Sequence, residues 1–292
     1  MNGGDHVTLN LTDLLQQKKP LIFDGALGTE LARRNLIGGV ALNLTDPELI
    51  LNFHQEYAAI GVDFLTTNTF TANRIYCETH GLPIDFLSAN KAAVTLARQA
   101  AGPNQYVIGD LGPTGRLLKP YGDFTEEQFH ANFAEQAATL AAAGADALII
   151  ETMTDLREAL TALKASKKVT TLPVMVTLSY ATTDKGGRTI MGATIAEAAA
   201  ALKANGASAI GANCGELTPL QMAEIAALYR RHTTLPIIIQ PNAGIPKLIS
   251  GKTVYEMSPT DFAAGIQQCF DNGASIIGGC CGTTIEHIKE LI

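Results

Sequence analysis

Short apolar runs alternate with longer helical stretches along the whole sequence, and this alternation limits the folds that it can adopt. The runs predicted as strands are 21–23, 63–67, 106–109, 146–150, 173–178, 208–212, 236–240 and 275–278. Such runs are typical of parallel strands that are buried on both faces. Eight successive strand–helix units favour a closed (β/α)8 TIM barrel over an open doubly wound sheet. We therefore predict one α/β domain over residues 1–292, with residues 1–15 as a lead-in helix.

A repeated glycine supports the barrel. In four places a predicted helix ends in glycine, followed by Ala-Asp, Ala-Ser or Val-Asp and then a strand; these glycines are Gly61, Gly144, Gly206 and Gly273. Glycine is the residue best suited to the left-handed position that ends a helix. The spacing between them is long enough for two strand–helix units, so they are predicted to precede strands two, four, six and eight.

Polar residues and cysteines gather seven and eight positions after each of these glycines. The pairs are Asn68–Thr69, Glu151–Thr152, Asn213–Cys214 and Cys280–Cys281. All are predicted to lie at the carboxyl ends of strands, the face where TIM barrels place their chemistry. Strand ends become polar in any barrel, which explains the Asn and Thr residues but not three converging cysteines.

Cys214, Cys280 and Cys281 form a candidate zinc site. Their strands are separated by one strand in the predicted barrel wall, so the three thiols can meet across its mouth. Zn²⁺ is tetrahedral and favours sulfur, and three protein ligands with an open fourth position are typical of a catalytic zinc. Cys77 and Cys269 lie in helical patterns and are predicted to be small buried hydrophobes.

A zinc ion with three thiolate ligands is suited to holding a substrate thiol as a thiolate. A free thiol has a pKa of about 8.5, and coordination to a metal removes its proton. Two alternatives remain open from the residues alone. One is a metal-free phosphate-binding isomerase that uses the glycines near strand eight, and the other is a non-enzymatic zinc or redox thiol protein with a vicinal disulfide at Cys280–Cys281.

Charge and composition argue against several other classes. The net charge is −7 and the sequence has no long basic run, so a nucleic-acid partner is not expected. The apolar runs are too short to span a membrane. The start of the chain does not resemble a signal peptide, and the five cysteines are an odd number. We therefore expect a cytoplasmic protein with reduced thiols.

The sequence resembles the zinc-dependent homocysteine S-methyltransferases over roughly residues 21–292. The shared segments are 23–30 (FDGALGTE), 66–70 (TTNTF), 109–115 (GDLGPTG), 151–152 (ET), 211–215 (GANCG), 241–244 (PNAG) and 278–284 (GGCCGTT). The GGCCGTT segment is highly specific, especially together with the upstream Asn-Cys pair. Within this family the chain looks closest to the homocysteine-binding module of cobalamin-dependent methionine synthases.

The resemblance implies that L-homocysteine is the substrate and methionine the product. The backbone N–H groups of Gly25 and Ala26 are expected to bind the substrate carboxylate, because glycine allows such an anion nest. Asp24 and Glu151 are expected to receive its ammonium group. The alternative for Asp24 is a turn or helix cap, and the alternative for Glu151 is a cap of the following helix.

The resemblance also implies zinc on Cys214, Cys280 and Cys281. Asn242 ends strand seven, and its amide oxygen is a candidate for a fourth ligand that the substrate displaces; the alternative is an asparagine turn. Asn213 is expected to bind substrate or to support the neighbouring ligand.

The methyl donor is the part of the prediction that the sequence leaves open. It is either a small donor such as S-methylmethionine, or a methyl-corrinoid or methylfolate system on a separate protein. Loop 109–115 is predicted to shape the donor side, with Asp110 helping to position the substrate. Loop 183–188 is predicted to be either a solvated hairpin or a lid.

Overall fold

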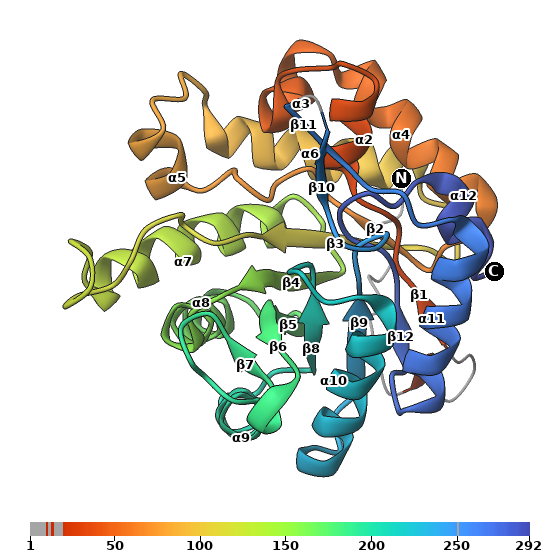
Figure 1. Ribbon diagram of the computed structural model, residues 1–292. Helices are drawn as coiled ribbons and strands as arrows, with labels where there is room; N and C mark the ends of the chain where they lie inside the picture. Colours follow the sequence, from red (N-terminus) through yellow and green to blue (C-terminus); the bar gives the residue numbers. More distant parts are fainter. Residues whose placement is uncertain (1–9, 11–12, 15–19, 250) are drawn as a thin grey trace.

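The computed structural model describes residues 10, 13–14, 20–249 and 251–292 and shows an α/β barrel (Figure 1). Its main sheet is parallel and contains β1 (Leu21–Ile22), β2 (Phe64–Thr66), β3 (Tyr106–Leu111), β4 (Ala147–Met153), β5 (Val174–Leu178), β8 (Ala209–Asn213), β9 (Ile237–Gln240) and β12 (Ile276–Ile277). The predicted fold class is confirmed, and the strand bounds differ from those predicted by no more than three residues.

The sheet closes between its first and last strands. The strand order is β1-β12-β9-β8-β5-β4-β3-β2, and a parallel bridge between Phe23 and Phe64 joins the two ends of this order. The backbone N–H of Asp63 donates to Ile22 O (2.8 Å), and that of Asp24 donates to Phe64 O (3.2 Å). The residues just after β1 therefore lie at the seam of the barrel.

The helices surround the strands. They are α2 (Leu27–Arg33), α3 (Leu42–Thr45), α4 (Pro47–Ile60), α5 (Arg74–Thr79), α6 (Phe86–Ala100), α7 (Glu126–Ala142), α8 (Leu156–Val169), α9 (Ile195–Ala204), α10 (Pro219–His232), α11 (Pro259–Asp271) and α12 (Ile285–Lys289). Gly61, Gly144, Gly206 and Gly273 have φ values of 92°, 101°, 81° and 105°, so all four have the left-handed conformation expected where a helix ends.

The barrel interior is filled by one apolar cluster: Leu21, Phe23, Phe64, Ile108, Ala147, Ile149, Met175, Ala209, Ile238 and Ile276. Successive side chains of a strand point to opposite faces, so residues two positions further along also point inward. This alternation places Asp110, Glu151, Thr177 and Gln240 in the layer above the apolar cluster. The polar side chains at the base of the barrel mouth thus result from the two-residue alternation of side chains along each strand.

Two antiparallel hairpins extend from the carboxyl ends of strands. β6 (Tyr180–Thr182) pairs with β7 (Arg188–Thr189), with a short 3-10 turn at Asp184–Gly186 between them. Loop 183–188 thus forms the turn and second strand of a hairpin, and its movement as a lid stays a prediction. The second hairpin, β10 (Lys247–Ile249) with β11 (Lys252–Val254), follows β9 and was not predicted.

The predicted lead-in helix over residues 1–15 lies outside the described residues, except for residues 10 and 13–14, and stays a prediction. In the part of the chain that the structure describes, no helix is both long enough and apolar enough to cross a membrane.

Candidate metal centre

Three cysteine sulfurs meet at the carboxyl end of the barrel. Cys214 follows β8 and Cys280 and Cys281 follow β12, and these two strands flank β9 in the sheet. The Sγ atoms of all three lie within 4.8 Å of one another. The Sγ atoms of Cys214 and Cys281 are 3.8 Å apart. Among the described residues this is the one cluster of side chains with metal-ligand spacing.

The backbone leaves β geometry where it presents these sulfurs. Cys214 has a φ of 58°, a left-handed conformation that is uncommon for a residue with a side chain. Cys280 N donates to Pro241 O (2.8 Å), which ties the loop after β12 to the end of β9. Gly282 also has a positive φ, 81°, so the chain turns directly after the cysteine pair. Adjacent cysteines can therefore point to one site.

The spacing of the sulfurs fits a tetrahedral metal ion. Zn–S bonds of about 2.3 Å at tetrahedral angles give sulfur–sulfur distances of about 3.8 Å. Hydrogen bonds from the Cys214 and Cys280 thiols, together with one from Tyr255, lower the pKa of Cys281 to about 3. The same hydrogen bonding, together with burial, raises the pKa of Cys280 well above its usual range. A bound metal would displace the protons of the thiols that coordinate it.

Asn242 carries a buried acceptor next to this cluster. Its Nδ2 donates to Gly215 O (2.6 Å), one residue beyond Cys214. Its Oδ1 is buried and has no hydrogen-bond partner among the described residues. A turn is also present, since Gly244 N donates to the Asn242 carbonyl (2.8 Å). The turn explains the backbone conformation at Asn242. It does not involve the side-chain Oδ1, which is therefore available to bind a metal.

Asn213 is fully buried and fixed by hydrogen bonds from several directions. Its Oδ1 accepts from Thr152 N (2.9 Å) and Thr177 Oγ1 (2.8 Å). Its Nδ2 donates to Thr152 Oγ1 (2.7 Å) and lies 3.4 Å from Glu151 Oε2 and 3.8 Å from Cys280 Sγ. This one amide therefore connects the metal cluster with the end of β4.

Three carboxyl groups face the same space: Asp24 and Asp110 are buried, and Glu151 is partly buried. Burial raises the pKa of Asp24 to about 7. Burial, followed by the charges of Asp24 and Cys281, raises the pKa of Glu151 to about 8. Burial and the charges of Glu151 and Asp24 raise the pKa of Asp110 well above its usual range. Carboxyl groups whose pKa values are raised by burial and by neighbouring negative charges are suited to binding a cationic group, which would stabilise their ionised forms.

Neither of the two predicted ammonium-binding acids caps a helix. Asp24 accepts from Thr66 N (2.8 Å) and Thr66 Oγ1 (2.7 Å), while the residue that caps α2 is Ala26. The cap of α8 is Asp155, four residues beyond Glu151. The capping alternatives from the sequence are thus wrong for both acids.

The loop after β1 is held by Thr283. Thr283 Oγ1 accepts from Ala26 N (3.3 Å) and donates to Cys280 O (2.7 Å). A Cβ atom on Gly25 would lie 2.5 Å from Tyr57 Oη, so only glycine fits there. The hydroxyl of Tyr57 is itself buried without a hydrogen-bond partner among the described residues. A substrate carboxylate at this loop would compete with Thr283 for the Ala26 amide.

Sequence reasoning missed two polar residues near the cluster. Gln240 ends β9, and its buried Oε1 has no hydrogen-bond partner among the described residues. A polar residue directly after three isoleucines was a signal that could have found it. Tyr255 follows the unpredicted hairpin β10–β11, and no pattern along the chain links it to the cysteines.

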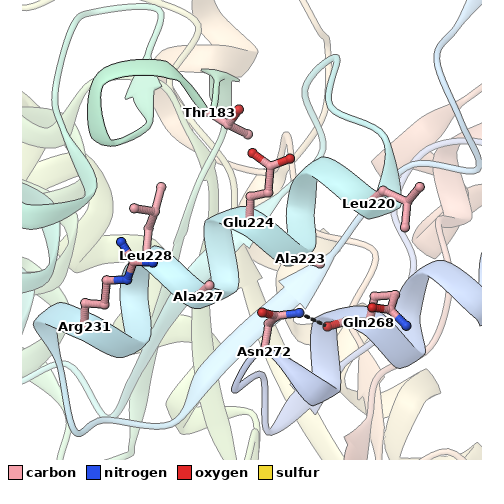
Figure 2. A pocket seen from close by; sticks show the side chains of 9 residues that line it. All are labelled: Thr183, Leu220, Ala223, Glu224, Ala227, Leu228, Arg231, Gln268 and Asn272. Atoms are coloured by element: carbon pink, nitrogen blue, oxygen red, sulfur yellow. Dashed lines mark hydrogen bonds between the residues drawn. The ribbon is translucent and has the colours of Figure 1, made fainter.

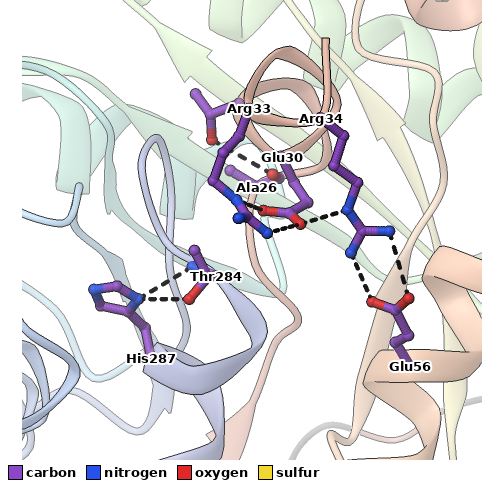
Figure 3. A network of polar contacts seen from close by, with 8 residues as sticks. Ala26, Glu30, Arg33, Arg34, Glu56, Thr284 and His287 are labelled. Carbon is purple, nitrogen blue, oxygen red and sulfur yellow. Dashed lines mark hydrogen bonds and ion pairs between the residues drawn. The ribbon is translucent and has the colours of Figure 1, made fainter. Parts of the chain in front are cut away.

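A cavity of about 790 Å³ lies between α2, the end of β11 with Tyr255, and the residues that follow Cys281; none of the three cysteines lines it. Its lining includes Arg33, Tyr255 and Gly282. Figure 3 shows how Arg33 is anchored, since Glu30 Oε1 accepts from Arg33 Nη2 (2.6 Å) and from Arg34 Nε (2.7 Å). A second cavity, of about 500 Å³, lies outside the barrel between α10 and α11 (Figure 2). It contains none of the residues at the barrel mouth.

Comparison with known proteins agrees with this geometry. The model of the homocysteine S-methyltransferase family matches residues 21–292. The chain is 30% identical to methionine synthase of Mycobacterium leprae, with 96% of this chain and 25% of that protein aligned. Methionine synthase of Mycobacterium tuberculosis is also 30% identical, over 97% of this chain and 25% of its own length. The chain thus spans about a quarter of the length of these relatives.

Among solved structures, the metallated form of the homocysteine methyltransferase MmuM from Escherichia coli superposes with a TM-score of 0.79. It shares 24% identity, and the superposition covers 96% of this chain and 98% of that one. At this identity the likeness establishes a common fold.

Proposed function

Because the chain belongs to the homocysteine S-methyltransferase family, we propose that it transfers a methyl group to the sulfur of L-homocysteine and releases methionine. The observation that carries the proposal is the approach of Cys214, Cys280 and Cys281 to within 4.8 Å at the mouth of the barrel. Zn²⁺ is the metal that best suits three thiolates at this spacing. When bound, it would lower the pKa of a substrate thiol so that homocysteine reacts as a thiolate.

The substrate ammonium group is assigned to the acid cluster of Asp24, Asp110 and Glu151. Asp24 and Asp110 are buried and Glu151 is partly buried; the charge of Asp24 raises the pKa of Glu151, and the charges of both raise that of Asp110. An ammonium group placed among them would reverse this effect by compensating the charge that burial disfavours. Asp110 Oδ1 has no hydrogen-bond partner among the described residues, so it is available to accept from the ammonium group.

The substrate carboxylate is assigned to the loop after β1. The N–H groups of Gly25 and Ala26 lie at the start of α2, where the helix dipole favours negative charge. The N–H of Ala26 donates to Thr283 Oγ1 at 3.3 Å, a long distance that indicates a weak bond. A substrate carboxylate would compete with this hydroxyl for the N–H. With the ammonium group at the acids and the carboxylate at this loop, the thiol arm would be directed toward the cysteines.

Asn213 and Asn242 would act on the metal site in different ways. Asn213 holds the end of β4 next to Cys280 and orients Glu151, so it supports both the metal ligands and the substrate site. Asn242 would offer Oδ1 to the metal in the absence of substrate, because this buried oxygen has no other partner among the described residues. Homocysteine would then replace it.

The methyl donor is proposed to be S-methylmethionine or a corrinoid or folate carrier on a separate protein. Direct transfer needs the donor methyl group in line with the substrate sulfur. It needs no basic residue, because the metal-bound thiol would already have lost its proton. The relatives named methionine synthase are about four times as long as the aligned region. This length favours a carrier, whereas the cavity next to the residues that follow Cys281 favours a small donor.

The proposal is tested by measuring bound metal and methionine formation together. Purified protein is incubated with homocysteine and with S-methylmethionine, betaine, methylcobalamin or methylated folate, and methionine is quantified. We expect about one zinc ion per chain and product with at least one donor. A chain without stoichiometric metal would overturn the proposal and restore the metal-free isomerase as an alternative. A metal that shows no response to homocysteine would favour the zinc or redox thiol protein.

A further inference from the structure

Two buried threonine hydroxyls lie between the ends of β2 and β3. Thr67 and Thr69 follow β2 within the segment 66–70 (TTNTF), and their exposed fractions are 2% and 0%. Hydroxyl groups that are shielded from water need hydrogen-bond partners within the protein. The methyl transfer described above uses neither side chain.

The two hydroxyls close a ring of hydrogen bonds on the backbone of Asp110. Asp110 N donates to Thr67 Oγ1 (3.0 Å), and Thr69 Oγ1 donates to Asp110 O (2.7 Å). The Oγ1 atoms of Thr67 and Thr69 are themselves 2.7 Å apart. Because Thr69 gives its only proton to the Asp110 carbonyl, the hydroxyl of Thr67 must donate to that of Thr69. All three bonds therefore run in one direction around the ring, and bonds aligned in this way strengthen one another.

The ring takes the place of strand pairing that ends at this level. The pairing of β2 with β3 runs to Thr66 and Ile108, and Thr67 N donates to Ile108 O (2.9 Å). Two residues further along β3, the N–H and C=O of Asp110 extend beyond the end of the neighbouring strand. The threonine hydroxyls supply the acceptor and the donor that a longer β2 would have offered.

Neighbouring residues keep the ring in place. Gln136 in α7 donates from Nε2 to Thr69 O (3.0 Å) and, over 3.4 Å, to Asp110 O. A Cβ atom on Gly112 would lie 2.4 Å from Phe70 O, so the close contact between the two strand ends requires glycine there. The backbone on both sides of the ring is thus closely packed.

The side chain of Asp110 has no such support of its own. Its Oδ1 is buried and has no hydrogen-bond partner among the described residues. Asp24 differs, because its carboxyl group accepts directly from Thr66 N (2.8 Å) and Thr66 Oγ1 (2.7 Å). The position of the Asp110 carboxyl group therefore depends on its backbone, and the backbone is held by the threonine ring.

We propose that Thr67 and Thr69 are positioning residues for homocysteine, which hold Asp110 where its carboxyl group accepts from the substrate ammonium group. The inference rests on the proposed function, because that function assigns the ammonium group to the acid cluster. Neither threonine touches the substrate in this arrangement. Their effect reaches the substrate through its ammonium group and not through its thiol or its carboxylate.

The test removes one hydroxyl and keeps the shape of the side chain. Thr69→Val opens the ring, whereas Thr69→Ser keeps the hydroxyl. Thr95→Val is the control, since Thr95 is exposed on α6 and bonds Lys91 O within its own helix. Isothermal titration of the zinc-loaded protein measures the dissociation constants of homocysteine and of γ-mercaptobutyrate, which has the same thiol and carboxylate but no ammonium group.

The expected result is a loss that depends on the ammonium group. Thr69→Val should weaken homocysteine binding by about 10-fold, the lower end of the loss expected for a hydrogen bond to a charged group. Its affinity for γ-mercaptobutyrate should equal that of wild type, because this thiol has no group for Asp110 to bind. Thr69→Ser and Thr95→Val should bind both thiols as wild type does.

Thr67→Val opens the same ring at its other member and gives a second test. It is expected to weaken homocysteine binding to a similar extent. The double variant of Thr67 and Thr69 should then lose less affinity than the product of the two single fold-changes, because either substitution alone breaks the ring. Losses that multiply would show two independent hydroxyls and would overturn the ring as the positioning device.

The outcomes distinguish this inference from the proposed function. If wild type binds homocysteine and forms methionine, but Thr69→Val binds homocysteine as tightly as wild type or weakens both thiols equally, the inference is overturned and the proposed function stands. If wild type does not bind homocysteine, both are overturned. A loss confined to homocysteine and restored in Thr69→Ser supports the inference.

Discussion

Asn213 and Thr152 exchange two hydrogen bonds between the ends of β8 and β4: Thr152 N donates to Asn213 Oδ1 (2.9 Å), and Asn213 Nδ2 donates to Thr152 Oγ1 (2.7 Å). Thr152 has a φ of 59° and Cys214, which follows Asn213, has a φ of 58°. Both strands therefore turn into left-handed geometry where this pair holds them. The reciprocal pair fixes the backbone that carries Cys214 and Glu151.

Replacing Asn213 by Ala is expected to reduce both stability and metal retention. The change leaves the buried donors of Thr152 and Thr177 without their acceptor, which costs about 1–3 kcal/mol of unfolding free energy. Urea denaturation and chelator competition measure the two effects. Asn104→Ala, at an exposed turn, is the control and should change neither quantity. Equal stability of wild type and Asn213→Ala would contradict this role.

Replacing Cys214, Cys280 or Cys281 by Ala is expected to abolish stoichiometric zinc and methyl transfer while the barrel stays folded. Two thiolates hold the metal much less tightly than three, and the cysteines lie in loops at the mouth rather than in the core. Metal analysis and circular dichroism check these expectations. Cys77→Ala is the matched control, since this cysteine is buried in α5 away from the cluster. A single variant of the trio with full metal and full activity would show that the residue is wrongly assigned.

Replacing Glu151 by Gln is expected to weaken homocysteine binding more than zinc binding. Loss of a charged hydrogen-bond partner costs about 1.5–3 kcal/mol, or roughly 10- to 150-fold in the dissociation constant for homocysteine. Isothermal titration of the zinc-loaded protein measures this constant. Glu158→Gln is the control, because Glu158 is also buried with a raised pKa but bonds Thr114 instead. Equal losses of homocysteine and zinc affinity in Glu151→Gln would argue against its assigned role.

Glu158 is expected to lower the unfolding free energy of the metal-free protein as the pH rises from about 5 to 8. Burial raises the pKa of Glu158 from 4.5 to about 7, so the folded state holds this proton after the unfolded state has released it. The stabilising effect is complete below the unfolded-state pKa and is lost as the pH passes through the folded-state pKa. Asp24 and Glu151 act in the same direction.

Urea unfolding at several pH values tests this expectation. Glu158→Gln should reduce the loss of unfolding free energy between pH 5 and 8 by up to about 3 kcal/mol, since it removes one group whose pKa differs between the two states. Glu48→Gln, in the exposed first turn of α4, should leave the pH dependence unchanged. A slope in Glu158→Gln equal to that of wild type would show that Glu158 does not contribute.

The barrel could be predicted because its strands are apolar runs between clear helix ends. The register was predictable too: the glycine repeat placed Glu151, Asn213 and the cysteines at equivalent strand ends. The bounds of β4 were less accurate, because the strand continues past Glu151 to Met153 through an irregular pairing. Whether these ends carry a metal and homocysteine stays a proposal.

The parts that could not be predicted depend on contacts between distant segments. Tyr255 packs against Gly282 only because the hairpin β10–β11 folds back to the end of β9. The bond between Thr283 and Ala26 joins residues 257 positions apart, and neither residue type signals it. The bonds that hold Asp24 come from Thr66 on the neighbouring strand, and no pattern along the chain signals them.

The hydroxyl of Thr283 bonds both Ala26, in the loop assigned to the substrate carboxylate, and Cys280, in the loop assigned to the metal. A ligand that draws the Ala26 amide away from this hydroxyl alters the surroundings of the cysteine. By thermodynamic reciprocity, the metal then changes the affinity for the amino acid by the same factor as the amino acid changes the affinity for the metal. Under the proposed assignments, loading of the two would therefore be coupled rather than independent, and the supply of metal would set how readily the barrel captures homocysteine.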